Sequence, residues 1–124
     1  MQIGIVVLGH GSRAVVDEAN EVLLELSNMI KANNGFQLLE TAFMNPESGR
    51  PGLEEAVYKL IGSGAKKIIV APVFISNGIH MQKDIPVMIE QLKAKYEVEI
   101  KCAAHMGADA KIAEIVSERI REVV

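Results

Sequence analysis

The stretch KIIVAPVFISNGIHMQKDIP, residues 67–86, runs from an apolar segment through small residues and one histidine into a second apolar segment. Its first part, residues 67–75, is strongly hydrophobic, which is typical of a strand covered on both faces. Asp84-Ile85-Pro86 predicts a helix start, because proline is tolerated in the first helical turn. A similar change occurs in IGIVVLGHGSR, residues 3–13, where an apolar run also ends at a lone histidine.

Strand-like runs alternate with helical patterns four times along the chain. Strands are expected at residues 2–8, 36–43, 67–75 and 97–103, and helices at residues 15–33, 53–62, 84–95 and 109–123. This βαβαβαβα alternation with short connections implies a parallel sheet. We therefore expect one doubly wound α/β domain over residues 1–124. Its four-stranded parallel sheet has the order 2-1-3-4 and helices on both faces.

Two further observations concern the first helix and the cysteine. The helix at residues 15–33 carries apolar side chains at helical spacing, namely Val15, Ala19, Val22, Leu23, Leu26 and Ile30. Cys102, within VEIKCAAH, is expected to be a small buried hydrophobic residue. As the only cysteine it cannot form an internal disulfide.

Composition excludes several classes of function. A chain of 124 residues is large enough for one domain with a real core. Its net charge of −3 and its aromatic content of 4% argue against nucleic-acid binding, which needs a basic face and stacking side chains. The chain contains no run of 18 apolar residues and no signal-peptide pattern, so we expect no membrane span and a cytoplasmic location.

The two histidines that follow apolar strands are the main functional signal. In the order 2-1-3-4 the first and third strands are neighbours, and ligands bind beyond the carboxyl ends of strands at such a switch point. His10 follows the first strand and His80 the third. Two imidazoles there could hold a divalent metal ion, accept protons, or do both. Their spacing matches no local zinc motif, so a role as hydrogen-bonded loop residues stays open.

Small residues surround both histidines, namely Gly9, Gly11 and Ser12 in one loop and Ser76, Asn77 and Gly78 in the other. Such residues let a backbone approach a ligand, or they serve only a tight strand-to-helix turn, and the sequence leaves both interpretations open. The cationic side chains nearest these loops are Arg13, Arg50 and Lys83.

Several familiar sites are missing from the sequence. The first loop is neither GxGxxG nor a P-loop, and the chain has no GxSxG elbow. A phosphate-handling enzyme with His10 as nucleophile is a distant possibility. That class predicts an arginine directly before the histidine, where this chain has Gly9.

Three segments resemble a known family. LGHGSR (8–13), GAKKIIVAPVFISNGIHMQKDIP (64–86) and MGADAKIAEIVSERI (106–120) are similar to the short-form sirohydrochlorin chelatases of the cobalt and nickel type, which are ATP-independent class II chelatases. The resemblance implies insertion of Co²⁺, or Ni²⁺, into sirohydrochlorin for cobalamin-type tetrapyrrole biosynthesis, with release of two protons and no organic cofactor. It also implies a homodimer, because a chain of this length resembles one half of the longer members.

The resemblance assigns roles to residues of this chain. His10 would be the proton acceptor and a metal ligand, and His80 the second ligand. The residues expected to contact the macrocycle are Gly11, Ser12, Arg50, Ile75, Ser76, Asn77, Gly78 and Ile79. At Arg50, directly before Pro51, the family commonly has Glu-Pro, so this position departs from the pattern. The alternatives are a nickel or iron chelatase for the same substrate, or a non-catalytic carrier of tetrapyrrole or metal.

Overall fold

The computed structural model describes residues 2–76, 78 and 80–124, and for His80 and Met81 it describes the backbone only. The elements are β1 (Ile3–Gly9), α1 (Glu18–Asn34), β2 (Leu38–Phe43), a 3₁₀ turn (Pro46–Ser48), α2 (Leu53–Gly62), β3 (Lys67–Pro72), a π-helical turn (His80–Asp84), α3 (Ile85–Tyr96), β4 (Glu99–Cys102) and α4 (Ala110–Val123). All strand pairs are parallel and the sheet order is β2-β1-β3-β4, which confirms the predicted fold class and strand order.

Strand β1 lies at the centre of the sheet and pairs with both β2 and β3. Its residues after Ile3 are all buried, as the continuous apolar run predicted. Leu8 lies opposite Ala42 of β2 and Pro72 of β3, so the carboxyl ends of the three strands coincide. The loops that follow these strands therefore begin side by side at one edge of the sheet.

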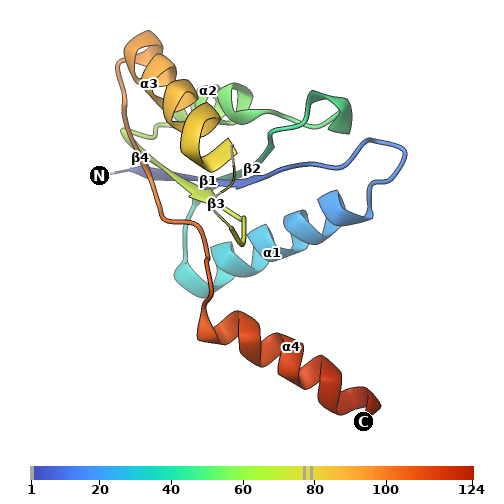
Figure 1. Cartoon of the computed structure of the whole chain (residues 1–124). Coiled ribbons are helices and arrows are strands. Elements are labelled where there is room, and N and C mark those ends of the chain that lie inside the picture. Colours follow the sequence, from blue (N-terminus) through green and yellow to red (C-terminus); the bar gives the residue numbers. More distant parts are fainter. Residues whose placement is uncertain (1, 77, 79) are drawn as a thin grey trace.

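Helices cover both faces of the sheet, as expected (Figure 1). Helices α2 and α3 pack on one face, where Val6 and Leu8 of β1 meet Leu60 of α2 and Ile89 of α3. Helix α1 packs on the other face through Leu23, against Ile5, Val7 and Phe43. This second face has the smaller core.

Helix α1 presents a different stripe from the one that apolar spacing predicted. Its buried residues are Asn20, Leu23 and Ser27, which recur at a helical period on the side facing the sheet. Val22 and Leu26, two of the apolar residues at helical spacing, are 48% and 40% exposed. The helix also begins at Glu18, so Val15 precedes it and is exposed. The predicted helix is thus present, but its buried stripe coincides with the apolar spacing only at Leu23.

Helix α4 stands apart from the sheet at the end of the chain (Figure 1). None of its 14 residues, all of which are described, is buried. Cys102 ends the edge strand β4 and is exposed, so the expectation of a buried cysteine was wrong. Its position at the end of an edge strand leaves one side without a neighbouring strand. Among the helices of the described residues, none has both the length and the apolar character needed to cross a bilayer.

Candidate functional site

His10 is placed at the carboxyl edge of the sheet by backbone hydrogen bonds on both sides of β1. The N–H of Val73 donates to the carbonyl of Leu8 at 2.8 Å, which continues the pairing with β3. Beyond the pairing with β2, the N–H of Met44 donates to Gly9 O at 2.9 Å and that of Asn45 to His10 O at 2.7 Å. The His10 backbone is therefore held where β1 and β2 both end, although the residue itself is exposed.

The glycines beside His10 are required by the fold. A Cβ on Gly9 would lie 2.4 Å from Cδ2 of Leu23, so this position lets α1 approach the sheet closely. Gly11 has φ +94°, which side-chain-bearing residues rarely adopt, and a Cβ there would lie 3.1 Å from Cβ of Phe43. The turn and the close packing thus account for both glycines without a ligand.

The geometry favours one tautomer of the His10 ring. Nδ1 lies 3.2 Å from the carbonyl oxygen of Gly11. A carbonyl oxygen only accepts hydrogen bonds, so this contact requires the proton on Nδ1. The lone pair is then on Nε2, the nitrogen that can accept a proton or bind a metal ion.

Two cavities meet at His10. One, of about 270 Å³, is mainly apolar and lies between the loop after β1 and α1, with Ala19, Val22, Leu26, Phe43 and Val73 in its wall. The other, of about 390 Å³, lies between His10 and the loop after β2 and is lined also by Arg13, Met44, Asn45, Pro46 and Glu47. His10, Gly11 and Ser12 therefore line a depression with an apolar wall on one side and polar groups on the other.

The segment expected to carry the second histidine is described in part. Ile75, Ser76 and Gly78 are exposed, whereas Asn77, Ile79 and the His80 side chain lie outside the described residues. The backbone of His80 opens a π-helical turn that leads directly into α3, with Gln82 N–H donating to Gly78 O at 3.0 Å. Helical irregularities of this kind frequently occur at functional sites.

Among the side chains that the structure describes, no group of three or more His, Cys, Asp or Glu could hold a metal ion. His105 lies half-buried after β4. Its neighbours Met106 and Gly107 donate backbone hydrogen bonds to Phe74 O and Ile75 O at 3.0 and 2.9 Å. His105 therefore belongs to the segment that adjoins the loop after β3.

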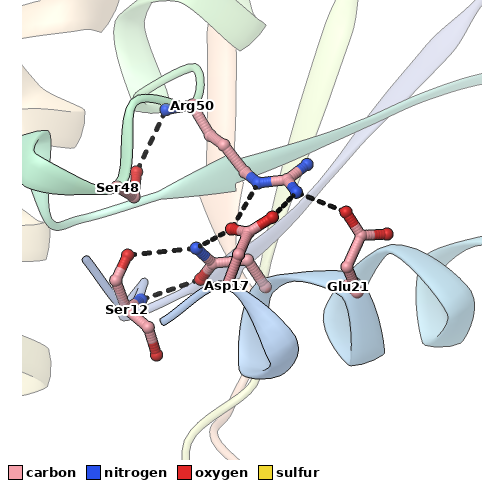
Figure 2. Close-up of polar contacts among 6 residues, drawn as sticks. Ser12, Asp17, Glu21, Ser48 and Arg50 are labelled. Carbon is pink, nitrogen blue, oxygen red and sulfur yellow. Dashed lines mark hydrogen bonds and ion pairs between the residues drawn. The ribbon is translucent and has the colours of Figure 1, made fainter. Parts of the chain in front are cut away.

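Arg50 points toward the start of α1 rather than outward (Figure 2). Its guanidinium forms an ion pair with Asp17 and another, at 2.5 Å, with Glu21. The hydrogen bonds that Arg50 donates lower the pKa of Asp17, and its donation to the Asp17 and Glu21 carboxylates raises the pKa of Arg50. The side chain of Arg50 is only 23% exposed. The structure thus places this expected substrate contact within an internal ion-pair cluster.

The other cationic side chains near the loops lie at the surface. Arg13 pairs with Glu47 at 3.2 Å, with side chains 74% and 66% exposed, and Lys83 is exposed in the π-helical turn. Both lie where an anionic ligand at the sheet edge could reach them.

Two asparagines hold this loop and were not singled out in the sequence. Asn45 Nδ2 donates to Gly11 O at 3.2 Å, and the buried Asn20 contacts Ser12. A sequence signal did exist for Asn20, because it lies three and seven residues before Leu23 and Ser27 on the buried stripe of α1.

Comparison with known proteins identifies the family. The CbiX family model matches residues 4–123. The chain is 32% identical to "Sirohydrochlorin cobaltochelatase" of Methanopyrus kandleri, with 98% of this chain and 97% of that protein covered. It is 35% identical to the protein of the same name from Sulfurisphaera tokodaii, with 98% and 93% covered.

Solved structures agree with this assignment. A putative cobalamin biosynthesis CbiX protein from Marinobacter aquaeolei is 27% identical, with a TM-score of 0.79 and 97% and 95% of the two chains covered. The sirohydrochlorin chelatase SirB from Bacillus subtilis, solved with cobalt, is 25% identical with a TM-score of 0.89. The match covers 99% of this chain but 51% of SirB, so this chain spans about half of that protein. From the family-model match over nearly its whole length, the chain belongs to the CbiX family.

Proposed function

We propose that this chain is a sirohydrochlorin cobaltochelatase, which inserts Co²⁺ into sirohydrochlorin without ATP and without an organic cofactor. The observation that carries the proposal is the near-complete coverage in both directions by relatives of that name, at 32% and 35% identity. The placement of His10 at the switch point of the sheet supports it, because α/β sheets bind ligands at this edge.

His10 is the proton acceptor and a metal ligand in this proposal. Metal insertion needs a base for the two pyrrole N–H protons and a ligand that delivers the ion and then releases it. Nε2 of His10 suits both tasks in the tautomer that the Gly11 carbonyl favours. His80, which begins the π-helical turn, is the second ligand. Two protein ligands leave coordination positions for the macrocycle nitrogens.

The macrocycle occupies the depression around His10. The apolar cavity accepts part of its ring system, and Arg13 and Lys83 attract its carboxylates. Gly11, Ser12 and the segment from Ile75 through Ser76, Asn77, Gly78 and Ile79 border it. Arg50, as an ion-pair partner of Asp17 and Glu21, does not need to touch the substrate.

The experiment is a mixing assay with purified protein, sirohydrochlorin and Co²⁺, followed by the visible spectrum of the macrocycle, against a control without protein. Catalysed insertion supports the chelatase, whereas tight macrocycle binding without acceleration supports a carrier. Ni²⁺ and Fe²⁺ are compared in the same assay, since a SirB structure was also solved with Fe³⁺. The relative kcat/KM values then rank the metals.

His10→Ala is expected to reduce insertion by about 10²–10⁴-fold, the usual contribution of a positioned base, without loss of fold. His105→Ala is the matched control and keeps the wild-type rate. His80→Ala raises the Co²⁺ concentration needed for half-maximal rate. Wild-type activity in His10→Ala would remove His10 from its role, and an unchanged Co²⁺ dependence would remove His80.

A homodimer is part of the proposal. Helix α4 carries Ile115, Val116 and Ile120 on one stripe, each more than half exposed. A surface helix normally buries such a stripe. The occupant we infer is a second copy of this chain, because SirB provides about one further chain length beside the matched half.

Size-exclusion chromatography with light scattering tests the dimer. The wild type elutes as a dimer, Ile115→Glu/Ile120→Glu as a monomer, and Glu118→Gln, which changes an exposed polar residue of the same helix, as a dimer. A monomeric wild type at micromolar concentration would refute the dimer. A dimeric double variant would show that α4 is not the interface.

A further inference from the structure

The loop that carries His10 is fixed from two directions. On one side the segment after β2 holds it. Asn45 bonds the carbonyls of His10 and Gly11, and Ala14 N–H donates to Glu47 O at 3.1 Å. On the other side the loop is held by the side chain of Asn20 in α1.

Asn20 bonds both backbone groups of Ser12. Its Oδ1 accepts from Ser12 N–H at 2.8 Å, and its Nδ2 donates to Ser12 O at 3.0 Å. Asn20 is only 1% exposed, so these are hydrogen bonds of a buried amide and are costly to lose. Because the side-chain amide bonds both the N–H and the C=O of Ser12, it fixes this backbone as a paired strand would. Ser12 is two residues from His10.

Asp17 determines the orientation of this amide. Asn20 Nδ2 donates its second hydrogen to Asp17 Oδ1 at 2.7 Å. A carboxylate only accepts, so the NH₂ group must face Asp17, and Oδ1 is then left for Ser12 N–H. Asp17 is the N-cap residue of α1, yet its side chain makes no capping hydrogen bond to the backbone of the helix. Its carboxylate instead accepts hydrogen bonds from the side chains of Asn20 and Arg50.

Arg50 in turn holds Asp17. Its Nε donates to Asp17 Oδ1 at 3.1 Å, its Nη2 pairs with Asp17 Oδ2, and Nη2 also contacts Glu21 (Figure 2). This fork fixes the carboxylate in two directions, which a lysine could not do. The backbone of Arg50 is itself held by Ser48 Oγ, at 3.2 Å from its N–H.

We propose that Arg50, Asp17 and Asn20 form a positioning relay that fixes the backbone of the His10 loop. In this relay Arg50 acts through Asp17 and Asn20 on Ser12, rather than by binding a carboxylate of the substrate. The importance of the relay for catalysis rests on the proposed chelatase function, but its effect on the loop does not. Arg50, Asp17 and Asn20 are thus positioning residues, while His10 is the catalytic one.

The test combines amide hydrogen exchange at Ser12 with steady-state kinetics. Substitution of the buried Asn20 could disturb the fold, so the experiment uses the partly exposed residues Arg50 and Asp17. The variants are Arg50→Gln, Asp17→Asn and the double variant. Glu54→Gln is the matched control, because it neutralises one partner of the Glu54–Lys95 ion pair between α2 and α3. We expect Ser12 exchange to accelerate by about tenfold or more in the three relay variants and to stay unchanged in Glu54→Gln.

The kinetics separate positioning from substrate binding. A relay predicts that Arg50→Gln and Asp17→Asn each lower kcat by about tenfold and leave KM for the macrocycle within twofold. The kcat of the double variant should be no lower than that of the less active single variant. A raised KM in Arg50→Gln with a wild-type Asp17→Asn would make Arg50 a substrate ligand and overturn the proposal. Unchanged Ser12 exchange would also overturn it. A wild-type protein with no insertion activity would instead refute the proposed function, and Ser12 exchange would then decide the relay alone.

Discussion

Replacing Gly9 by alanine tests whether α1 packs on the sheet as closely as described. The added Cβ would lie 2.4 Å from Cδ2 of Leu23, where real carbon atoms do not approach, so the Leu23 side chain must move. Leu23 is 7% exposed and packs against Ile5, Val7 and Phe43. Overpacking of this kind costs about 1–3 kcal/mol. Because the contact is with the flexible end of a side chain, we expect the lower half of that range.

A double-mutant cycle isolates the contact. Leu23→Ala alone leaves a cavity and costs about 2–4 kcal/mol, whereas in Gly9→Ala/Leu23→Ala the new methyl group enters space that Leu23 vacates. The double variant should therefore lose about 1 kcal/mol less than the sum of the single variants. Gly62→Ala is the control, because no atom lies within 4 Å of a Cβ there. It should be neutral or slightly stabilising.

Urea unfolding monitored by circular dichroism measures these values, with every variant at one protein concentration so that any association contributes equally. If Gly9→Ala costs no more than Gly62→Ala, or if the two substitutions add without coupling, the close approach of α1 to β1 is refuted.

Two further measurements follow from the charges and the thiol. The pKa of Asp17 is lowered from its ordinary value of 3.8, mainly by its hydrogen bond with Arg50. The ionised carboxylate therefore stabilises the fold above that value, and this contribution is lost as the pH falls through the lower folded pKa. The difference in urea midpoint between wild type and Asp17→Asn should be constant from pH 7 to 5 and shrink below about pH 4. A difference that stays constant down to pH 2.5 would contradict the ion pair. Burial raises the pKa of the Cys102 thiol above 9.0 although the residue is exposed. One thiol per chain should react with a disulfide reagent in the native protein, at a rate still rising above pH 9.0, and a rate that levels off near pH 8 would show that the thiol is not shielded.

The fold was predictable because the strands can be recognised from local patterns of apolar residues in the sequence. The apolar runs of β1 and β3 are continuous in the sequence, and their short connections to helices leave few topologies. The position of His10 followed from that topology. Burial of individual side chains did not follow, since the exposure of Cys102 and Val22 depends on what covers them in three dimensions.

The relay could not be found by spacing alone. Arg50 and Asp17 are 33 residues apart, and either could have been a solvated charge. Arg50 was expected to contact substrate because of the family resemblance at the position before Pro51, and nothing in a sequence tells which way a guanidinium points. Asn20 looked like a polar position of an amphipathic helix. Only the rotation of α1 about its axis, set by Gly9 and Leu23, turns it toward Ser12.

An exposed base needs a rigid backbone beneath it. In the proposed reaction His10 meets both a metal ion and a macrocycle, so its ring has to stay accessible, as the exposure of this residue allows. A loop with that exposure would ordinarily be mobile, and each misplaced conformer would reduce the fraction of encounters in which Nε2 faces the pyrrole nitrogens. The chain fixes the backbone beneath the ring, in addition to the contact of the ring Nδ1 with Gly11 O. Carbonyl and N–H groups from Gly9 to Ala14 are bonded to Met44, Asn45 and Glu47 on one side and to Asn20 on the other. The proposed reaction needs both the exposure of His10 and the rigidity of its support, and loosening the support should lower kcat without moving the ring out of the site.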